Sequence, residues 1–389
     1  MRYAVLVLLA MALLAACSDR SALEPTAPRT ATGAAASAEA RAKDSYIVVL
    51  KPGANPRALA AAVGANPRFV YQAALNGFAA TLNAGQLNGL RHNPHVSWIE
   101  PDQVVRATTI QTGAPEALDR IDQRALPRNG TYTYTSTASD VNVYVIDSGI
   151  YTQHPEFEGR AVNTGFDAIG GSNPGGDCSG HGTHVAGSIG ARTYGVAKKV
   201  RLLGVRVLNC DSIPKGLISG VIAGVDWVTA NHKPPAVANL SLGAPASAAL
   251  DSAVNRLADQ RVFVAVAAGN QSTDACTVSP ARARNAYAVA GVKTNDERYG
   301  FSNWGPCVDI YAPGTAVVST WNDGTVRALD GTSMAAPHVA GVAALYKATN
   351  PNVTTNVIHG WLRSNATVDA VIKGSINSTP NYLLYKAGL

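Results

Sequence analysis

Short apolar runs alternate with helical segments through most of the chain after residue 108. Branched and apolar residues fill positions 141–146, 200–207, 236–240, 262–267 and 286–292. Helical stretches lie between several of these runs, notably 217–229 and 248–258. Continuous apolar strands that alternate with helices are typical of a parallel sheet buried on both faces. The pattern predicts an α/β domain over residues 108–389.

A shorter unit with a different pattern precedes that domain. Strands are predicted at residues 46–50, 69–72, 78–82 and 95–100, with a helical segment at 57–63. Strands interleaved with two helices in so short a stretch indicate a small α+β unit of the split-βαβ, ferredoxin-like kind. We place this unit at residues 44–107.

The amino terminus carries the pattern of an export signal. Arg2 precedes an apolar run, residues 4–16, which is too short to span a bilayer and is typical of a signal peptide. Its end, Leu14-Ala15-Ala16-Cys17, resembles the lipobox of bacterial lipoproteins, which implies a lipid on Cys17; the alternative is an ordinary signal peptide cut near the same alanines. Residues 18–43, rich in Ser, Ala, Pro and Thr, are expected to form a flexible tether.

Composition narrows the class of protein. Of the 389 residues, 47% are hydrophobic and only 15% are charged, which excludes a mostly disordered chain. The net charge of +6 arises mainly in residues 1–107, which hold ten Lys and Arg but six Asp and Glu. The chain has no basic run and no aromatic stripe, so nucleic-acid binding is not expected.

In parallel sheets, active-site residues lie at the carboxyl ends of strands, and three polar residues of this chain are expected there. Asp147 directly follows the strand at 141–146, and Ser333 lies between Gly331 and an Ala-rich helical run. His181 is followed by His184, and such a pair could also hold a metal ion. A zinc peptidase of that kind needs a glutamate beside the first histidine, where this chain has Gly182, so metal ligation is disfavoured.

Together these segments, in the order Asp, His, Ser, resemble the subtilases, the subtilisin-like serine proteases, over residues 108–389. The resemblance implies a three-layer subtilisin-like fold and a serine endopeptidase that acts on polypeptides. It implies that Asp147 orients the imidazole, that His181 is the general base and then the acid, and that Ser333 is the nucleophile. Asn270, which follows the strand at 262–267, matches the asparagine of the oxyanion hole. A catalytically silent surface lipoprotein is the rival hypothesis, and it is disfavoured because all three triad residues are present.

The same resemblance assigns a substrate cleft. It implies that a substrate strand lies along Ser241, Leu242 and Gly243. The P1 side chain of the substrate would pack between these residues and a second segment, Ala267, Ala268 and Gly269. Their small, uncharged walls predict an apolar or broad P1 preference. The opposite rim, residues 210–217, is longer than in close relatives by about two residues, which leaves preferences at more distant subsites open.

Apart from Cys17, four cysteines remain, an even number in an exported chain. They allow three pairings. Their positions resemble those of the proteinase K and aqualysin branch, which implies the bonds Cys178–Cys210 and Cys276–Cys307. The alternative is four free thiols.

The resemblance also implies structural calcium. Asp309 matches a calcium ligand whose partners are the backbone carbonyls of Arg284 and Ala286. A second site of the aqualysin branch corresponds to Asp119, Asp122, Gln123, Asn129 and Thr131. Oxygen ligands suit this hard cation. The alternative is that these are ordinary capping and loop residues.

Residues 44–107 resemble the inhibitor-type propeptide of subtilases. The resemblance implies that this unit blocks the cleft of its own enzyme until it is removed. We expect self-cleavage close to Ala107-Thr108, which would separate the catalytic domain from any lipid on Cys17. A monomeric, exported enzyme is expected.

Overall fold

The computed structural model describes residues 44–102, 109–170 and 175–389. Two compact units divide the chain, Met1–Arg106 and Ala107–Leu389. The expected signal peptide, Cys17, the tether and the processing site near Ala107-Thr108 lie outside the described residues. In the described part of the chain, no helix is both long and apolar enough to cross a bilayer.

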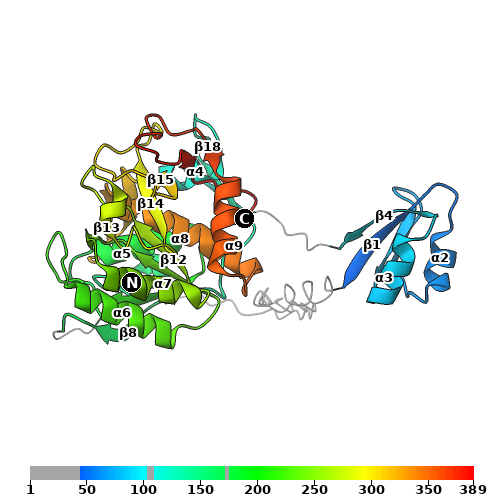
Figure 1. Cartoon of the computed structure of the whole chain (residues 1–389), viewed down its shortest axis with the longest axis horizontal. Helices are drawn as coiled ribbons and strands as arrows, with labels where there is room; N and C mark the ends of the chain where they lie inside the picture. Colours follow the sequence, from blue (N-terminus) through cyan, green and yellow to red (C-terminus); the bar gives the residue numbers. More distant parts are fainter. Residues whose placement is uncertain (1–43, 103–108, 171–174) are drawn as a thin grey trace, which may run out of the picture. The chain divides into compact units, whose positions relative to one another are not determined.

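The smaller unit is an antiparallel sheet with two helices (Figure 1). Its strands follow the order β2-β3-β1-β4, so that β1 lies between β3 and β4. The elements are β1 Ser45–Leu50, α2 Pro56–Ala62, β2 Phe69–Tyr71, β3 Gly77–Thr81, α3 Ala84–Arg91 and β4 Val96–Pro101. Val48, Phe78 and Leu90 are fully buried in its core. This βαββαβ arrangement agrees with the expected split-βαβ topology.

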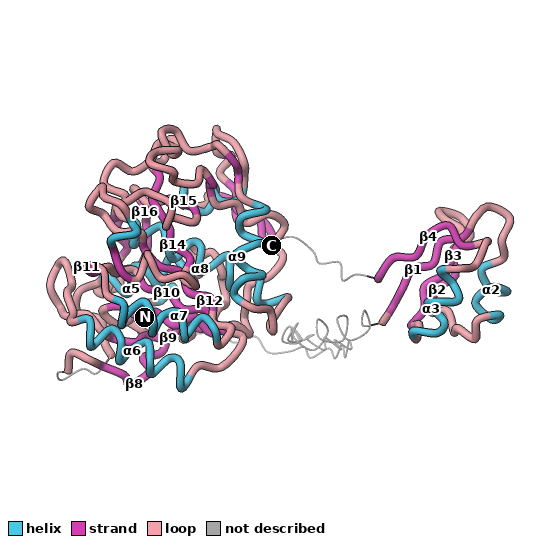
Figure 2. The backbone as a smooth tube through the Cα atoms, in the orientation of Figure 1, coloured by secondary structure: helices cyan, strands magenta, loops and turns pink. Residues whose placement is uncertain are grey.

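A nine-stranded sheet forms the middle of the larger unit (Figure 2). Its order is β18-β19-β15-β14-β12-β10-β7-β9-β8, and all neighbours are parallel except β18 and β19. The strands are β7 Asn142–Asp147, β8 Ala161–Asp167, β9 Arg201–Arg206, β10 Ala236–Leu240, β12 Phe263–Ala267, β14 Tyr287–Val292, β15 Ile310–Pro313, β18 Thr367–Val368 and β19 Tyr382–Leu383.

Helices cover both faces of this sheet because its strands are apolar on both sides. Val143 and Val145 of β7 pack toward one group of helices, and Tyr144 and Ile146 pack toward the other. The first group is α5 His181–Gly190, α8 Thr332–Thr349 and α9 Thr355–Asn365, and the second is α6 Ile218–Asn231 and α7 Ala248–Asp259. The result is the expected three-layer α/β architecture.

The remaining elements are short. They are the helix α4 Glu116–Asp122, 3₁₀ turns at Pro155–Phe157 and Ala275–Thr277, and three strand pairs: β5 Thr109–Thr112 with β6 Thr131–Tyr134, β11 Ala244–Pro245 with β13 Val278–Ser279, and β16 Val317–Thr320 with β17 Val326–Leu329. The site described below lies at the carboxyl ends of β7, β10 and β12 and at the amino ends of α5 and α8.

Candidate active site

Asp147 and His181 meet where β7 ends and α5 begins. The Nδ1 atom of His181 lies 2.8 Å from Oδ1 of Asp147. The same oxygen accepts a hydrogen bond from the backbone N–H of Ser148 at 2.7 Å. Asp147 is fully buried, whereas the His181 ring is partly exposed. The aspartate therefore fixes one ring nitrogen of His181 and leaves Nε2 for other partners.

Helix α5 begins without a side-chain cap of its own, because its cap residue is Gly180, at φ +99°. Asp177 replaces that cap. Its carboxylate accepts hydrogen bonds from the backbone N–H groups of Ser179, Gly180 and Thr183 and from the hydroxyls of Ser148 and Thr183. The Ser148 hydroxyl in turn accepts from the N–H of Gly182 at 2.9 Å. Asp177 thus joins the segment after Asp147 to the helix that carries His181, a role that no sequence motif indicated.

The charges around His181 favour its protonated form. Burial lowers the pKa of His181, but the charge and hydrogen bond of Asp147 and the charge of Asp177 raise this pKa above its ordinary value. A base with a raised pKa takes up a proton more readily, which suits a group that must accept one during a reaction.

Ser333 occupies the first turn of α8. Its hydroxyl donates to the backbone carbonyl of Ser241 at 3.1 Å. The carbonyl of Ser333 has no helical partner because Pro337, four residues later, has no N–H group. The Ser241 hydroxyl fills that place and donates to the Ser333 carbonyl at 2.8 Å. A proline inside the helix thereby ties the serine to the end of β10.

Asn270, just beyond β12, is held by one end of its amide. Its Oδ1 accepts from the backbone N–H and the hydroxyl of Thr332, at 2.9 and 3.0 Å. This arrangement directs the oxygen to Thr332 and leaves the NH₂ group as a donor. The backbone on both sides of Asn270 is braced by Asn303, whose side chain donates to Ala268 O and accepts from the N–H of Gln271.

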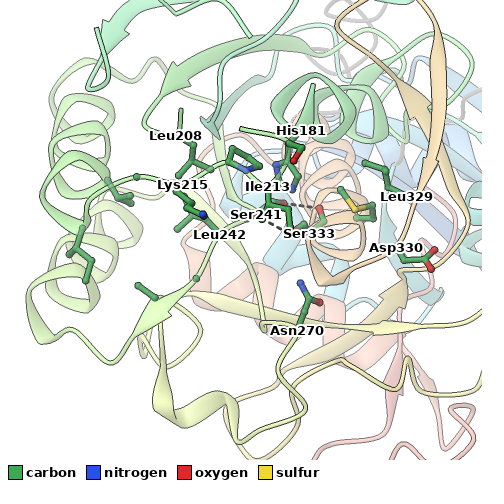
Figure 3. Close-up of a pocket in the computed structure, with 18 of the residues that line it drawn as sticks. His181, Leu208, Ile213, Lys215, Ser241, Leu242, Asn270, Leu329, Asp330 and Ser333 are labelled. Carbon is green, nitrogen blue, oxygen red and sulfur yellow. Dashed lines mark hydrogen bonds between the residues drawn. The ribbon is translucent and has the colours of Figure 1, made fainter. Parts of the chain in front are cut away.

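A cavity of 560 Å³ joins these side chains (Figure 3). His181, Ser333 and Asn270 line it, and so do residues 241–243. The segment 267–269 is not among the lining residues of this cavity, and Ala267 and Ala268 are buried. Lining residues that the motifs did not indicate include Leu250, Tyr299 and Asp330.

The fold and this site agree with the relatives of the chain. The sequence pattern of the Subtilase family, peptidase S8, matches residues 138–382, and that of peptidase inhibitor I9 matches residues 45–108. The chain belongs to the subtilase family. It is therefore a serine peptidase preceded by an inhibitor-type propeptide domain, as the motifs implied.

Individual relatives support the same assignment. The chain is 49% identical over 327 residues to the extracellular serine proteinase of Thermus sp. (strain Rt41A), and the aligned region covers 83% of this chain and 78% of the relative. It is 47% identical over 316 residues to alkaline serine exoprotease A of Vibrio alginolyticus, covering 79% of this chain and 59% of that protein. The crystal structure of a cold adapted subtilisin-like serine proteinase matches with a TM-score of 0.69 and 47% identity, over 72% of this chain and 100% of the other. This likeness confirms the expected subtilisin-like fold.

Two disulfides link loops of the subtilase around its site. The structure contains Cys178–Cys210 and Cys276–Cys307, the pairing that the resemblance implied. They close sequence separations of 32 and 31 residues, and each restrains the unfolded chain by about 3–4 kcal/mol in the entropy model. The first joins the loop that precedes His181 to the start of the cleft rim.

The second histidine of the pair, His184, does not face a shared metal position with His181. Its Nε2 lies 3.0 Å from the carbonyls of both Val317 and Arg327, and burial lowers its pKa to about 4. His338 is likewise buried, with Nδ1 on the carbonyl of Met334. Across residues 44–102, 109–170 and 175–389, no group of three or more His, Cys, Asp or Glu side chains could hold a metal ion.

Asp309 has the properties expected of a calcium ligand in this subtilase. It is linked to β14 by Ala288, whose N–H donates to Asp309 Oδ2 at 2.7 Å. Burial raises the pKa of this carboxyl to about 7. A bound cation would offset the cost of ionising such a half-buried acid. Asp309 therefore fits a calcium ion, with the carbonyls of Arg284 and Ala286 as the further expected ligands.

The second expected calcium cluster is organised differently. Lys386 Nζ lies 2.9 Å from Asp122 Oδ1, and both side chains are buried. Asp119 accepts from the N–H groups of Asn129 and Gly130. The other candidates also bond within the loop, Gln123 to Ala125, Pro127 and Asn129, and Asn129 to Thr131. Lys386, rather than a calcium ion, supplies the positive charge beside Asp122, so this cluster does not fit the expected site.

Proposed function

We propose that this subtilase is an endopeptidase that hydrolyses polypeptides through an acyl-enzyme on Ser333. The observation that carries the proposal is the 2.8 Å contact between Asp147 and His181, in the same cavity as Ser333 and Asn270. A serine hydroxyl is a weak nucleophile until a neighbouring base removes its proton. The Asp147 contact orients the ring so that Nε2 can act as this base.

In the proposed reaction, Ser333 Oγ turns from the Ser241 carbonyl toward His181 Nε2 and attacks the carbonyl carbon of the scissile bond. Its proton moves to Nε2, and His181 then gives this proton to the leaving amine as the C–N bond breaks. Water attacks the acyl-enzyme in the same way, with His181 taking the water proton and returning it to Ser333 Oγ. Hydrogen bonds between catalytic groups are often long in the absence of substrate and shorten in the enzyme–substrate complex.

The oxyanion of each tetrahedral intermediate would accept from the Asn270 NH₂ and from the backbone N–H of Ser333. The Thr332 contacts support this role because they fix the Asn270 amide before substrate arrives. One donor of this kind is typically worth about 10²–10³ in turnover.

Replacing the nucleophile tests the mechanism. A Ser333→Ala variant is expected to lose peptide hydrolysis by several orders of magnitude, to about the 10³–10⁴ that remains over water without the triad. A fluorophosphonate should label Ser333 in the parent protein and leave the variant unlabelled. Full activity without labelling would overturn the proposal and favour the metal-dependent alternative, whereas the absence of both hydrolysis and labelling in the parent protein would favour the silent one.

We further propose that the enzyme is made as a zymogen. The inhibitor-type match at residues 45–108 supports an intramolecular inhibitor that ends near the expected cut at Ala107-Thr108. The Ser333→Ala precursor should remain uncut in the same host, and cutting at that position by the variant would contradict self-processing. Residues 108–389 are then the mature, monomeric enzyme, with residues 44–107 as its removable inhibitor.

Export is supported by the two disulfides and by the relative named as extracellular. Residues 1–17 would supply the address and 18–43 the tether. Intact mass of the membrane and culture fractions distinguishes a lipid on Cys17 of the precursor from a plain signal-peptide cut.

Substrate preference at P1 is proposed to be broad or apolar. The walls at Ser241, Leu242 and Gly243 carry no charge to select Lys or Arg. Sites cut in a peptide library report this preference directly.

Calcium at Asp309 is proposed to stabilise the fold rather than to take part in the chemistry. A chelator should lower the thermal unfolding midpoint of the inhibited enzyme, and added calcium should restore it. Asp309→Asn should remove most of this response, since the amide carries no charge for the cation. An equal calcium response in both proteins would overturn the assignment.

A further inference from the structure

The cleft carries unlike charges at its two ends. Among the described residues that line it, Lys215 is the one Lys or Arg and Asp330 is the one Asp or Glu. Figure 3 shows them on opposite sides of Ser333. Both side chains are exposed, so each is available to a charged group on a bound polypeptide.

The backbone holds Lys215 firmly at the rim. Asn209 clamps the loop at both ends, because its N–H donates to Lys215 O and its Oδ1 accepts from Lys215 N, both at 2.8 Å. Asn209 also donates to Asp211, the nearest acid along the chain. In the described part of the chain, no carboxylate pairs with the Lys215 ammonium. The loop therefore fixes the backbone of Lys215, whose ammonium group forms no ion pair with a carboxylate of the described residues.

Lys215 also marks the border between two hollows. Together with Gly216 it lines the active-site cavity and a neighbouring cavity of 430 Å³. The neighbouring cavity continues toward Ile169 and Leu217. A polypeptide that extends beyond the active-site cavity over this rim passes the same ammonium group.

We infer that Lys215 selects polypeptides with an acidic side chain two to four residues before the scissile bond. The inference rests on the proposed function, in which the substrate strand lies along residues 241–243. Lys215 and Leu242 both line the active-site cavity (Figure 3), and we place the side chains that precede the cut between this segment and the rim. An exposed ammonium attracts a carboxylate there and repels a second cation, and salt screens both effects.

The expected processing site does not contradict this preference, although it contains Arg106. That cut is made within one molecule, where the high effective concentration of the substrate segment outweighs a modest mismatch of charge. Selection among separate substrates has no such help.

Peptides that place Glu, Gln or Lys in turn at the second, third and fourth positions before a fixed cut test the inference. The parent enzyme should prefer Glu over Lys in kcat/KM by about three- to tenfold at one or more of these positions, and 1 M salt should shrink the ratio. Lys215→Glu should reverse the preference, and Lys215→Gln should bring the ratio close to one.

Lys233→Glu is the matched control. It changes the net charge by the same amount at an exposed lysine that does not line the cleft, so the ratio should stay as in the parent. Peptide hydrolysis with an unchanged Glu-to-Lys ratio in Lys215→Glu and Lys215→Gln would overturn the inference while leaving the proposed function intact. Absence of hydrolysis and of serine labelling in the parent would instead count against the proposed function.

Discussion

At the scale of single residues, Asp177 stabilises the two segments that carry Asp147 and His181. Its carboxylate receives hydrogen bonds from both sides of the Asp147–His181 contact and lies at the amino end of α5, where the helix dipole favours negative charge. Burial raises the pKa of Asp177, and the surrounding donors oppose that rise by favouring the charged form. The charge that braces the loop therefore also acts on the imidazole.

Asp177→Asn is expected to move the acidic limb of the kcat/KM profile to lower pH. Removing this charge lowers the raised pKa of His181, so the neutral, active ring persists to lower pH. Asp147 remains the other charge that raises this pKa. The lost hydrogen bonds should cost about 1–3 kcal/mol of stability. The pH profile and the urea midpoint give the two quantities.

An exposed acid gives the control for that change. Asp226→Asn, on α6, removes the same charge away from the site and should leave the profile in place. A purely structural role for Asp177 predicts lower stability with an unmoved acidic limb.

At the scale of elements, α8 is unusual because it is buried nearly all round, and its small residues allow close packing. An added Cβ at Gly341 would lie 2.5 Å from Val196 Cβ. Because Pro337 has no N–H group, the Ser333 carbonyl lacks its helical hydrogen bond and accepts one from the Ser241 hydroxyl instead. The same helix thus contributes to the core and also positions Ser333, the proposed nucleophile.

Gly341→Ala should lower the unfolding free energy by about 1–3 kcal/mol, because the added methyl group overpacks the core against Val196. Gly360→Ala, within α9, provides the contrast: its new methyl group meets open space and should be neutral or stabilise by up to about 1 kcal/mol. Urea unfolding of fluorophosphonate-inactivated enzyme measures both. Equal effects would show that the packing argument is wrong.

The sequence predicted the positions of helices and strands more accurately than the contacts between side chains. The strands expected from apolar runs end within one residue of those observed, because a strand buried on both faces is a continuous apolar segment. The strand β8 and the helix α9 were not predicted: β8 mixes polar residues and a glycine into its run, whereas α9 is amphipathic, with Ile358 and Leu362 on its buried face, and was missed. The motif residues at strand and helix ends were found, whereas Asp177 was not, because its partners come from separate elements.

At the scale of the whole molecule, the two ends of the subtilase unit are tied together. Lys386 donates through its backbone to Ile121 O, and its ammonium pairs with Asp122 at 2.9 Å. The Lys386 side chain is 2% exposed and that of Asp122 is 8% exposed. The sequence could not predict this pair because its members are far apart along the chain; the resemblance implied calcium ligands in this loop, with ordinary loop residues as the alternative.

Lys386→Met should destabilise the inhibited enzyme by about 3–5 kcal/mol, because it leaves a buried carboxylate without its cation. Adding Asp122→Asn should recover part of the loss, since no buried charge then remains unpaired. Urea midpoints of the single and double variants measure this coupling. Strictly additive losses would contradict it.

The Cys178–Cys210 bond joins the loop before His181 to the rim that carries Lys215. In a reducing cytoplasm this bond would not persist, so histidine loop and substrate rim would lack their shared anchor. If the chain is exported as proposed, the link between this loop and the rim would form only after export, in an oxidising compartment.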